Sequence, residues 1–315
     1  MEEVLNHFGL RVNPFSITPN TDLYCKLPYQ QEALQTIKFS LAEGNSIVIV
    51  SGEVGTGKTI LCRKLMLSLD ENYKVAFIPH PKMSVKALLK SIARDLGIEN
   101  TEEHDVYEAI NQRLIQNAEM GKKTVLIIDE AQNLSTDGLE TIRLLTNLET
   151  ETQKLIQIIL FAQPELMARL EQAEMRQFMQ RVMSVCQLDV LSFELLKDYM
   201  SGRLVKAGHE SGRLLEDATL KGIWKASSGV PRVVNILAYK AMMSAYVRDA
   251  ATISVVDVNR AIKESYSQLS SLTSNAQSQT QGWFQRDNLF TYGMLALSGC
   301  VMLTSVFLFI GDWLK

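Results

Sequence analysis

The feature that most constrains this fold is an apolar stretch that leads directly into a glycine-rich loop. The stretch Ser46–Val50 precedes Gly52–Thr59 (GEVGTGKT), which matches the phosphate-binding pattern G-x-x-x-x-G-K-[ST] at every fixed position. Glycines in such a loop let backbone N–H groups point at phosphate oxygens, and the lysine can reach the β- and γ-phosphates. A helix predicted over Lys58–Leu69 adds the positive end of its dipole. The pattern therefore predicts a site for a nucleoside triphosphate.

A second motif lies farther along the chain, where Thr124–Gln132 (TVLIIDEAQ) is an apolar strand candidate that ends in two acids. Asp129 can hold Mg²⁺ together with the Thr59 hydroxyl, and Glu130 can polarise a water aimed at the γ-phosphate. Adjacent carboxylates of this kind indicate a hydrolase rather than a passive binder. The candidate nucleotide contacts are Gly52, Glu53, Val54, Gly55, Thr56, Gly57, Lys58, Thr59 and Ile60.

Apolar strand candidates alternate with amphipathic helical patterns over the first 191 residues, and only helical patterns follow. This alternation predicts an α/β domain over residues 1–191, with a parallel sheet covered on both faces, and a small all-helical domain over 192–266. Ligands of such sheets bind at the carboxyl ends of the strands. The strand candidates are Ile47–Val50, Val75–Ile78, Val125–Asp129, Ile156–Phe161 and Val185–Val190. The helical patterns are Lys58–Leu69, Val85–Leu96, Val106–Glu119, Thr136–Leu148, Phe193–Ala207, Asp217–Ala226, Val230–Val247 and Val255–Tyr266.

The C-terminal part has a different composition. Residues 267–288 are rich in Ser, Gln and Thr, which is typical of a flexible linker. Residues 289–310 carry no charge and are long enough to cross a bilayer as one helix, followed by a short tail at 311–315. Because the nucleotide site must face ATP, we expect a single-pass protein with its large N-terminal part in the cytoplasm.

Charge and cysteine usage exclude several other classes. The formal net charge is −3, which gives no global electrostatic case for binding nucleic acid. Arg203, Lys206, Arg213 and Lys221 form a sparse positive scatter that we interpret as a solvated face. The four cysteines (Cys25, Cys62, Cys186 and Cys300) have no metal-ligand spacing, which predicts reduced thiols and no zinc.

With these motifs placed, the chain resembles the AAA+ ATPases of the general secretion pathway A (ExeA/GspA) group. Phe8–Phe15 (FGLRVNPF) resembles the amino-terminal signature of the group, and the two motifs described above match its Walker elements. Phe161–Leu166 (FAQPEL) and Gly229–Arg232 (GVPR) resemble two further stretches. Within the group, the chain most resembles the ATPases encoded with mannose-sensitive haemagglutinin (MSHA) type IV pilus assembly genes. Tyr29 and Ala162 depart from the pattern, where relatives often carry His and Gly.

The resemblance implies roles that spacing alone does not. Gln163 would be the sensor-1 residue, although a solvent-facing loop amide is the alternative. Arg232 would be the sensor-2 arginine, with a surface helix arginine as the alternative. Arg181 would be an arginine finger supplied to a neighbouring subunit, with Arg176 as the competing candidate. Phe15 and Tyr29 would pack around the adenine with Phe8, Pro14 and Gln30, unless they are simply core residues.

The resemblance also implies ATP and Mg²⁺ as ligands, a homo-oligomeric ring with six subunits, and an inner-membrane location beside an integral-membrane component of a pilus or secretion machine. Two other functions stay open. One is a DNA-dependent ATPase that regulates transposition, against which the membrane segment stands. The other is a membrane scaffold that binds ATP without hydrolysing it, against which Glu130 stands.

Overall fold

The computed structural model describes residues 2–18, 21–99, 106–150 and 153–265. The linker, membrane helix and tail expected over 267–288, 289–310 and 311–315 lie outside these residues. Within the described ranges, no helix combines the length and the apolar character needed to cross a bilayer. The chain divides into two compact units, residues 1–259 and 260–315, and the first contains the sheet and the helices α1 to α11.

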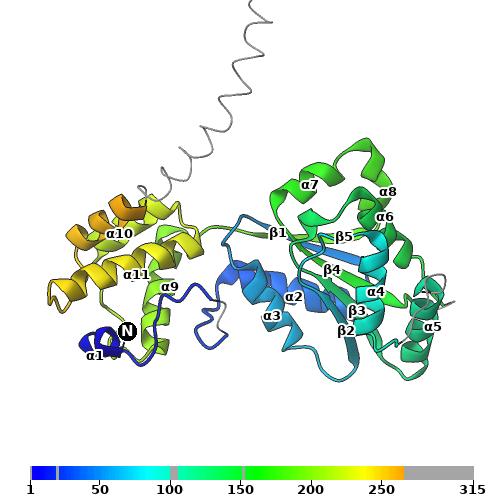
Figure 1. Ribbon diagram of the computed structural model, residues 1–315, viewed down its shortest axis with the longest axis horizontal. Coiled ribbons are helices and arrows are strands. Elements are labelled where there is room, and N and C mark those ends of the chain that lie inside the picture. Colours follow the sequence, from blue (N-terminus) through cyan, green and yellow to red (C-terminus); the bar gives the residue numbers. More distant parts are fainter. Residues whose placement is uncertain (1, 19–20, 100–105, 151–152, 266–315) are drawn as a thin grey trace, which may run out of the picture. The chain divides into compact units, whose positions relative to one another are not determined.

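All five predicted strands form one sheet in the order β2-β3-β4-β1-β5 (Figure 1). Every pair of neighbouring strands is parallel, as the alternation of strands and helices predicted. The strand at the β5 edge begins three residues earlier than predicted, because its first residues alternate between exposed and half-buried and therefore lack a continuous apolar run. The strands are β1 (Ile47–Gly52), β2 (Tyr73–Ile78), β3 (Lys123–Ile128), β4 (Ile156–Ala162) and β5 (Val182–Leu188).

Helices cover both faces of the sheet, and each face has its own apolar core (Figure 1). Alternate residues of β1 show the division, since Ile47 and Ile49 join one cluster and Val48 and Val50 the other. The first cluster packs under α4 (Val85–Asp95), α5 (Val106–Glu119), α6 (Thr136–Leu145), α7 (Pro164–Leu170) and α8 (Arg176–Met179). The second packs under α2 (Pro28–Ala42) and α3 (Lys58–Met66).

Local sequence signals begin several of these helices. Ser84, Ser135 and Ser192 each accept a hydrogen bond from the backbone N–H three residues later, which caps α4, α6 and α9 (Phe193–Lys206). Further elements follow no strong pattern in the sequence: α1 (Glu2–His7), α2, α7, α8 and the 3₁₀ turns η1 (Ala131–Asn133) and η2 (Ala173–Met175).

The helices that follow the sheet are those expected. They are α9, α10 (Asp217–Ser227), α11 (Pro231–Val247) and the helical residues 255–265. We call residues 193–259, which include α9, α10 and α11, the lid. Helix α1 packs beside α11, so the first residues of the chain lie against the lid (Figure 1).

Candidate functional site

The glycine-rich loop lies at the carboxyl end of β1, where the parallel sheet was expected to hold its ligand. Gly55 and Gly57 have φ values of 88° and 100°, which L side chains rarely adopt. The Lys58 ammonium turns back into the loop and donates to the carbonyl oxygens of Gly52 (2.6 Å) and Glu53 (2.9 Å). Burial lowers the pKa of Lys58, and the nearby Glu130 and Asp129 carboxylates act in the opposite direction. The loop thus has the shape and charge that a polyphosphate requires.

Two oxygen ligands suitable for Mg²⁺ meet beside this loop. The Thr59 hydroxyl donates to Asp129 Oδ2 over 2.9 Å, although the two residues lie 70 positions apart. Burial raises the pKa of Asp129, while the hydrogen bonds from Thr59 and from the Glu130 N–H lower it. Mg²⁺ in nucleotide sites takes one or two protein oxygens and completes its shell with water and phosphate. The Thr59–Asp129 pair fits that requirement.

The second acid, Glu130, is held by two glutamines. Gln132 Nε2 and Gln163 Nε2 both donate to Glu130 Oε2, the latter over 3.2 Å. Gln132 Oε1 in turn accepts from the Gln163 N–H over 3.1 Å. The strand order explains this meeting, because β4 lies between β1 and β3 and so places Gln163 between the loop after β1 and the acids after β3. Gln163 is therefore not a loop amide that faces only solvent.

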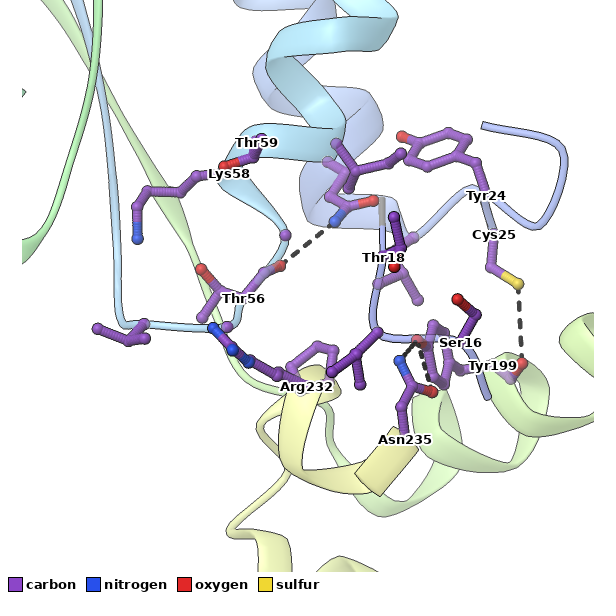
Figure 2. Close-up of a pocket in the computed structure, with 18 of the residues that line it drawn as sticks. Ser16, Thr18, Tyr24, Cys25, Thr56, Lys58, Thr59, Tyr199, Arg232 and Asn235 are labelled. Atoms are coloured by element: carbon purple, nitrogen blue, oxygen red, sulfur yellow. Dashed lines mark hydrogen bonds between the residues drawn. The ribbon is translucent and has the colours of Figure 1, made fainter. Parts of the chain in front are cut away.

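A cavity of about 370 Å³ opens beside the loop and is walled by three parts of the chain (Figure 2). Thr56, Lys58 and Thr59 lie on one side, and Ser16, Tyr199 and Asn235 lie on the other (Figure 2). The Arg232 N–H donates to the Gly55 carbonyl over 3.2 Å, and the Arg232 side chain extends toward Thr56 (Figure 2). The other lining residues are Ile17, Thr18, Tyr24, Cys25, Leu27, Gln30, Val54, Gly55, Gly57, Ile60, Glu130, Arg203 and Pro231.

Two of the expected adenine contacts do not line this cavity. Phe15 is 1% exposed and belongs to the interior, and Tyr29 packs against the apolar cluster under α2. Tyr29 is half-buried, and burial of its hydroxyl raises the pKa of the phenol. Their neighbours line the cavity instead, namely Ser16 beside Phe15 and Gln30 beside Tyr29. Phe8 and Pro14 are buried as well.

The sequence did not point to several residues that line the cavity, and one interpretation was wrong. Arg203, expected on a solvated face, is 8% exposed and lines the cavity beside Tyr199 and Asn235. No local pattern marks these residues, because Arg203 and Tyr199 meet partners before α2 that lie more than 150 positions away, and Asn235 is bonded to Tyr199 from another helix. The one available signal was that Arg203 falls on the apolar side of its helix, next to Leu204.

The two candidate arginine fingers lie away from this cavity. Arg181 precedes β5, which runs parallel to β1. It therefore lies at the amino-terminal ends of the strands, whereas the phosphate loop lies at their carboxyl ends. Its guanidinium donates to Asn147 Oδ1 over 2.8 Å. Arg176 is exposed at the start of α8. Neither arginine lines the cavity of its own chain.

Comparison with known proteins agrees with this geometry. Residues 41–170 match the family model described as "AAA domain". The "General secretion pathway protein A" of Aeromonas hydrophila is 34% identical over 260 residues, which cover 82% of this chain and 47% of that protein. The chain therefore spans about half the length of this curated relative.

Solved structures share the fold at low sequence identity. Cdc6p from Pyrobaculum aerophilum has a TM-score of 0.62 and 21% identity, over 80% of this chain and 70% of that one. The Aeropyrum pernix ORC2 protein, solved as ADPNP–ADP complexes, has a TM-score of 0.58 and 16% identity, over 75% and 66% of the two chains. The Walker-type ATPase PABY2304 of Pyrococcus abyssi has a TM-score of 0.57 and 14% identity, over 85% and 79%. At these identities the likeness shows the fold alone.

Proposed function

Because this chain belongs to the AAA-domain family of general secretion pathway protein A, we propose that it binds and hydrolyses ATP with Mg²⁺. Its work is at the bacterial inner membrane, where the globular part faces the cytoplasm and residues 289–310 anchor it. There it supports the assembly of an envelope machine, an MSHA-type type IV pilus or a type II secretion-like apparatus. The observation that carries hydrolysis is the Glu130 carboxylate, held by Gln132 and Gln163 beside the Thr59–Asp129 pair.

Each residue of the site has a separate task in this proposal. Lys58 and the loop N–H groups hold the phosphates, and Thr59 and Asp129 hold Mg²⁺, which offsets phosphate charge when bound. Glu130 orients the attacking water and accepts its proton, while Gln163 keeps the carboxylate aimed at the γ-phosphate. Arg232 reaches the phosphates from the lid. Arg181 serves the site of a neighbouring subunit in a ring of six.

The assembly role rests on the relative and on the sequence of the C-terminal part. The Aeromonas hydrophila protein is named for the general secretion pathway, and the uncharged residues 289–310 suit a membrane anchor. A net charge of −3 argues against the DNA-dependent alternative.

ATP turnover by the full chain in membranes tests the chemistry. We expect Glu130→Gln to keep ATP affinity within about threefold and to lower kcat by at least about a hundredfold, because the general base is lost. Lys58→Ala should lose binding itself. Full turnover by Glu130→Gln would contradict the assignment, and tight binding without turnover by the assembled wild type would favour a scaffold.

The same variants test the partner. The Glu130→Gln protein, stalled with ATP, is crosslinked in its native membrane, and co-purifying proteins are compared with those of Lys58→Ala. Enrichment of pilus or secretion components with the stalled form alone is the expected result. Enrichment of DNA or a transposase instead would overturn the envelope role while leaving the ATPase intact.

A further inference from the structure

One wall of the cavity is formed by residues that precede the sheet but are bonded to the lid. We call residues 2–18 and 21–27 the N-terminal segment. The N–H groups of Arg11 and Val12 donate to the Ala207 carbonyl at the end of α9, over 2.7 and 3.4 Å. At the start of the segment, His7 Nε2 lies 2.9 Å from the Ala250 carbonyl, and its ring meets Tyr246 of α11 edge-on. These contacts attach the segment to the end of α9 and to the end of α11.

The strongest link is Arg203, whose guanidinium is buried between α9 and the segment. It donates to the carbonyl oxygens of Pro14 and Ser16, the latter over 3.2 Å, and to the Tyr199 hydroxyl over 3.1 Å. Tyr199 is in turn bonded to Asn235 of α11. A buried guanidinium is costly unless its donors are paired, so this geometry resists separation of the two elements.

Contacts farther along the segment lead to the same helix. The Cys25 thiol donates to the Tyr199 carbonyl over 3.7 Å, and Lys206 donates to the Tyr24 carbonyl. On the other side, the Lys64 ammonium of α3 lies 5.5 Å from the centre of the Tyr24 ring. Among the described residues, most of the hydrogen bonds that leave the segment therefore join it to the lid, while Tyr24 and the residues before α2 also contact α3 and the start of α2.

The position of the segment decides which part of a nucleotide it meets. Ser16–Thr18, Tyr24, Cys25 and Leu27 line the cavity on the side away from Lys58 and Thr59. If the phosphates bind at Gly52–Thr59, a nucleotide directs its base and ribose toward these residues. We propose that the N-terminal segment forms the base end of the nucleotide cavity and moves with the lid as one body, with Arg203 as the positioning residue that joins them. This inference rests on the proposed nucleotide function. Lid movement then opens the cavity at the base and at Arg232 together.

Substitution of Arg203 tests the positioning role. We expect Arg203→Met to raise both the Kd and the KM for ATP about tenfold while kcat at saturation stays within about twofold, because the catalytic groups lie at the phosphate end. Arg203→Lys keeps one donor and should recover part of the loss. Arg213→Met, an exposed arginine of the lid, is the matched control and should change neither constant. Unchanged Kd in Arg203→Met, or a collapse of kcat with unchanged KM, would overturn the assignment.

A disulfide lock tests the one-body movement without removing any bond. A Cβ built on Gly202 of α9 lies 3.3 Å from the Cys25 sulfur, which suits a Gly202→Cys bridge. Burial raises the pKa of the Cys25 thiol, so an added oxidant such as copper phenanthroline is needed to close it. Because Cys25 itself lines the cavity, the informative constant is kcat, which we expect the bridged protein to keep within about twofold of the oxidised Gly202→Ser control. Lost turnover that dithiothreitol restores would show that the segment and lid must separate.

The outcomes separate this inference from the proposed function. If the wild type binds no ATP, or if Lys58→Ala binds as tightly as the wild type, the nucleotide function itself fails. If Lys58→Ala abolishes binding while Arg203→Met leaves it unchanged, only the positioning role fails. Thermal unfolding of each full-length variant identifies any Arg203 substitution that has lost the fold, and the bridged protein then decides the question.

Discussion

Glu130 has a left-handed backbone conformation, with φ at 53°, which is uncommon for a residue with a long side chain. The Glu130 N–H donates a hydrogen bond to the Asp129 carboxylate over 2.9 Å, and Gln132 and Gln163 hold the Glu130 side chain. Arg169 fixes the following turn by donating to the carbonyl oxygens of Gln132 and Leu134, over 2.9 Å each. Backbone strain of this kind persists only where the surroundings enforce it, and it is typical of functional sites.

Removing the hydrogen bond from Gln163 to Glu130 should affect the rate of ATP hydrolysis more than the affinity for ATP. We expect Gln163→Leu to lower kcat about tenfold or more and to change KM by less than about threefold, because a freed carboxylate orients water poorly. Steady-state ATPase assays measure both constants. Gln172→Leu, at an exposed position of the same region, should behave as the wild type. A Gln163→Leu protein with normal kcat would show that Gln132 alone positions Glu130.

Gly55 is the glycine of the phosphate loop that lies against Val230 and Arg232 of the lid. A Cβ at Gly55 would lie 2.7 Å from the Arg232 Cβ and 3.1 Å from Val230 Cγ1. We expect Gly55→Ala to weaken ATP binding about tenfold or more, because the loop and Arg232 must move apart. Gly121→Ala is the matched control, since Gly121 has a φ of 70° but nothing within 4 Å. Calorimetric titration should find normal ATP affinity in Gly121→Ala, and equal losses in both variants would contradict the clash.

At the scale of elements, a buried carboxylate joins the end of α11 to the helix that follows. Asp257 is fully buried and accepts hydrogen bonds from Arg248, Ser244 and Ser254. Burial raises the pKa of Asp257, yet these bonds together outweigh burial and leave the pKa below its usual value. The lid thus has a stabilising contact of its own, separate from the nucleotide site.

The sign of this shift predicts a pH dependence. A carboxyl group with a lowered folded-state pKa contributes stability above its unfolded pKa of about 3.9 and loses it as the pH falls below that value. We expect Asp257→Asn to be less stable than the wild type by about 2 kcal/mol at neutral pH, with the difference shrinking below about pH 4. Urea unfolding of the two full-length proteins measures this difference. The exposed Glu194→Gln should cost less than about 0.5 kcal/mol at either pH, and a difference for Asp257→Asn that does not depend on pH would contradict the ionic origin.

At the scale of the whole molecule, Arg181 cannot serve the site of its own chain. It lies before β5 and the phosphate loop lies after the parallel strand β1, so the length of a strand separates the two. A role for this arginine therefore requires a second subunit. We expect Arg181→Ala and Lys58→Ala each to lose turnover by at least about a hundredfold when alone, since one lacks the donor and the other lacks the site.

Mixing the two inactive proteins should restore part of the activity. In a mixed ring, an Arg181→Ala subunit has an intact site and receives Arg181 from a Lys58→Ala neighbour. ATPase assays over a range of mixing ratios measure this recovery. The comparison is a mixture in which Arg176→Ala replaces Arg181→Ala beside Lys58→Ala. Recovery of activity only in that second mixture would assign the arginine finger to Arg176. Full activity of both single arginine variants would argue against any arginine supplied by a neighbour.

The site at the phosphate end could be predicted because it depends on local sequence. Apolar runs of strand length and serine caps specify elements within a few residues, and the loop after β1 brings its own glycines, lysine and threonine. Asp129 and Glu130 follow directly from β3, and a parallel sheet places the carboxyl ends of β1 and β3 at one edge. The five strands, the helices predicted between them and the place of the glycine-rich loop after β1 are therefore confirmed.

The base end could not be predicted in the same way. Phe15 and Tyr29 were expected at the base or in the core, and Phe15 is buried while Tyr29 is half-buried against the cluster under α2. Arg203 was expected in solvent but is buried against Pro14 and Ser16. Burial of Arg203 depends on contacts between segments nearly 190 positions apart, and hydrophobic or polar character alone does not say which neighbour a residue will meet. The sequence by itself determined the elements and the chemistry of the phosphate loop, and only the tertiary structure decided which side chains enclose the rest of the cavity.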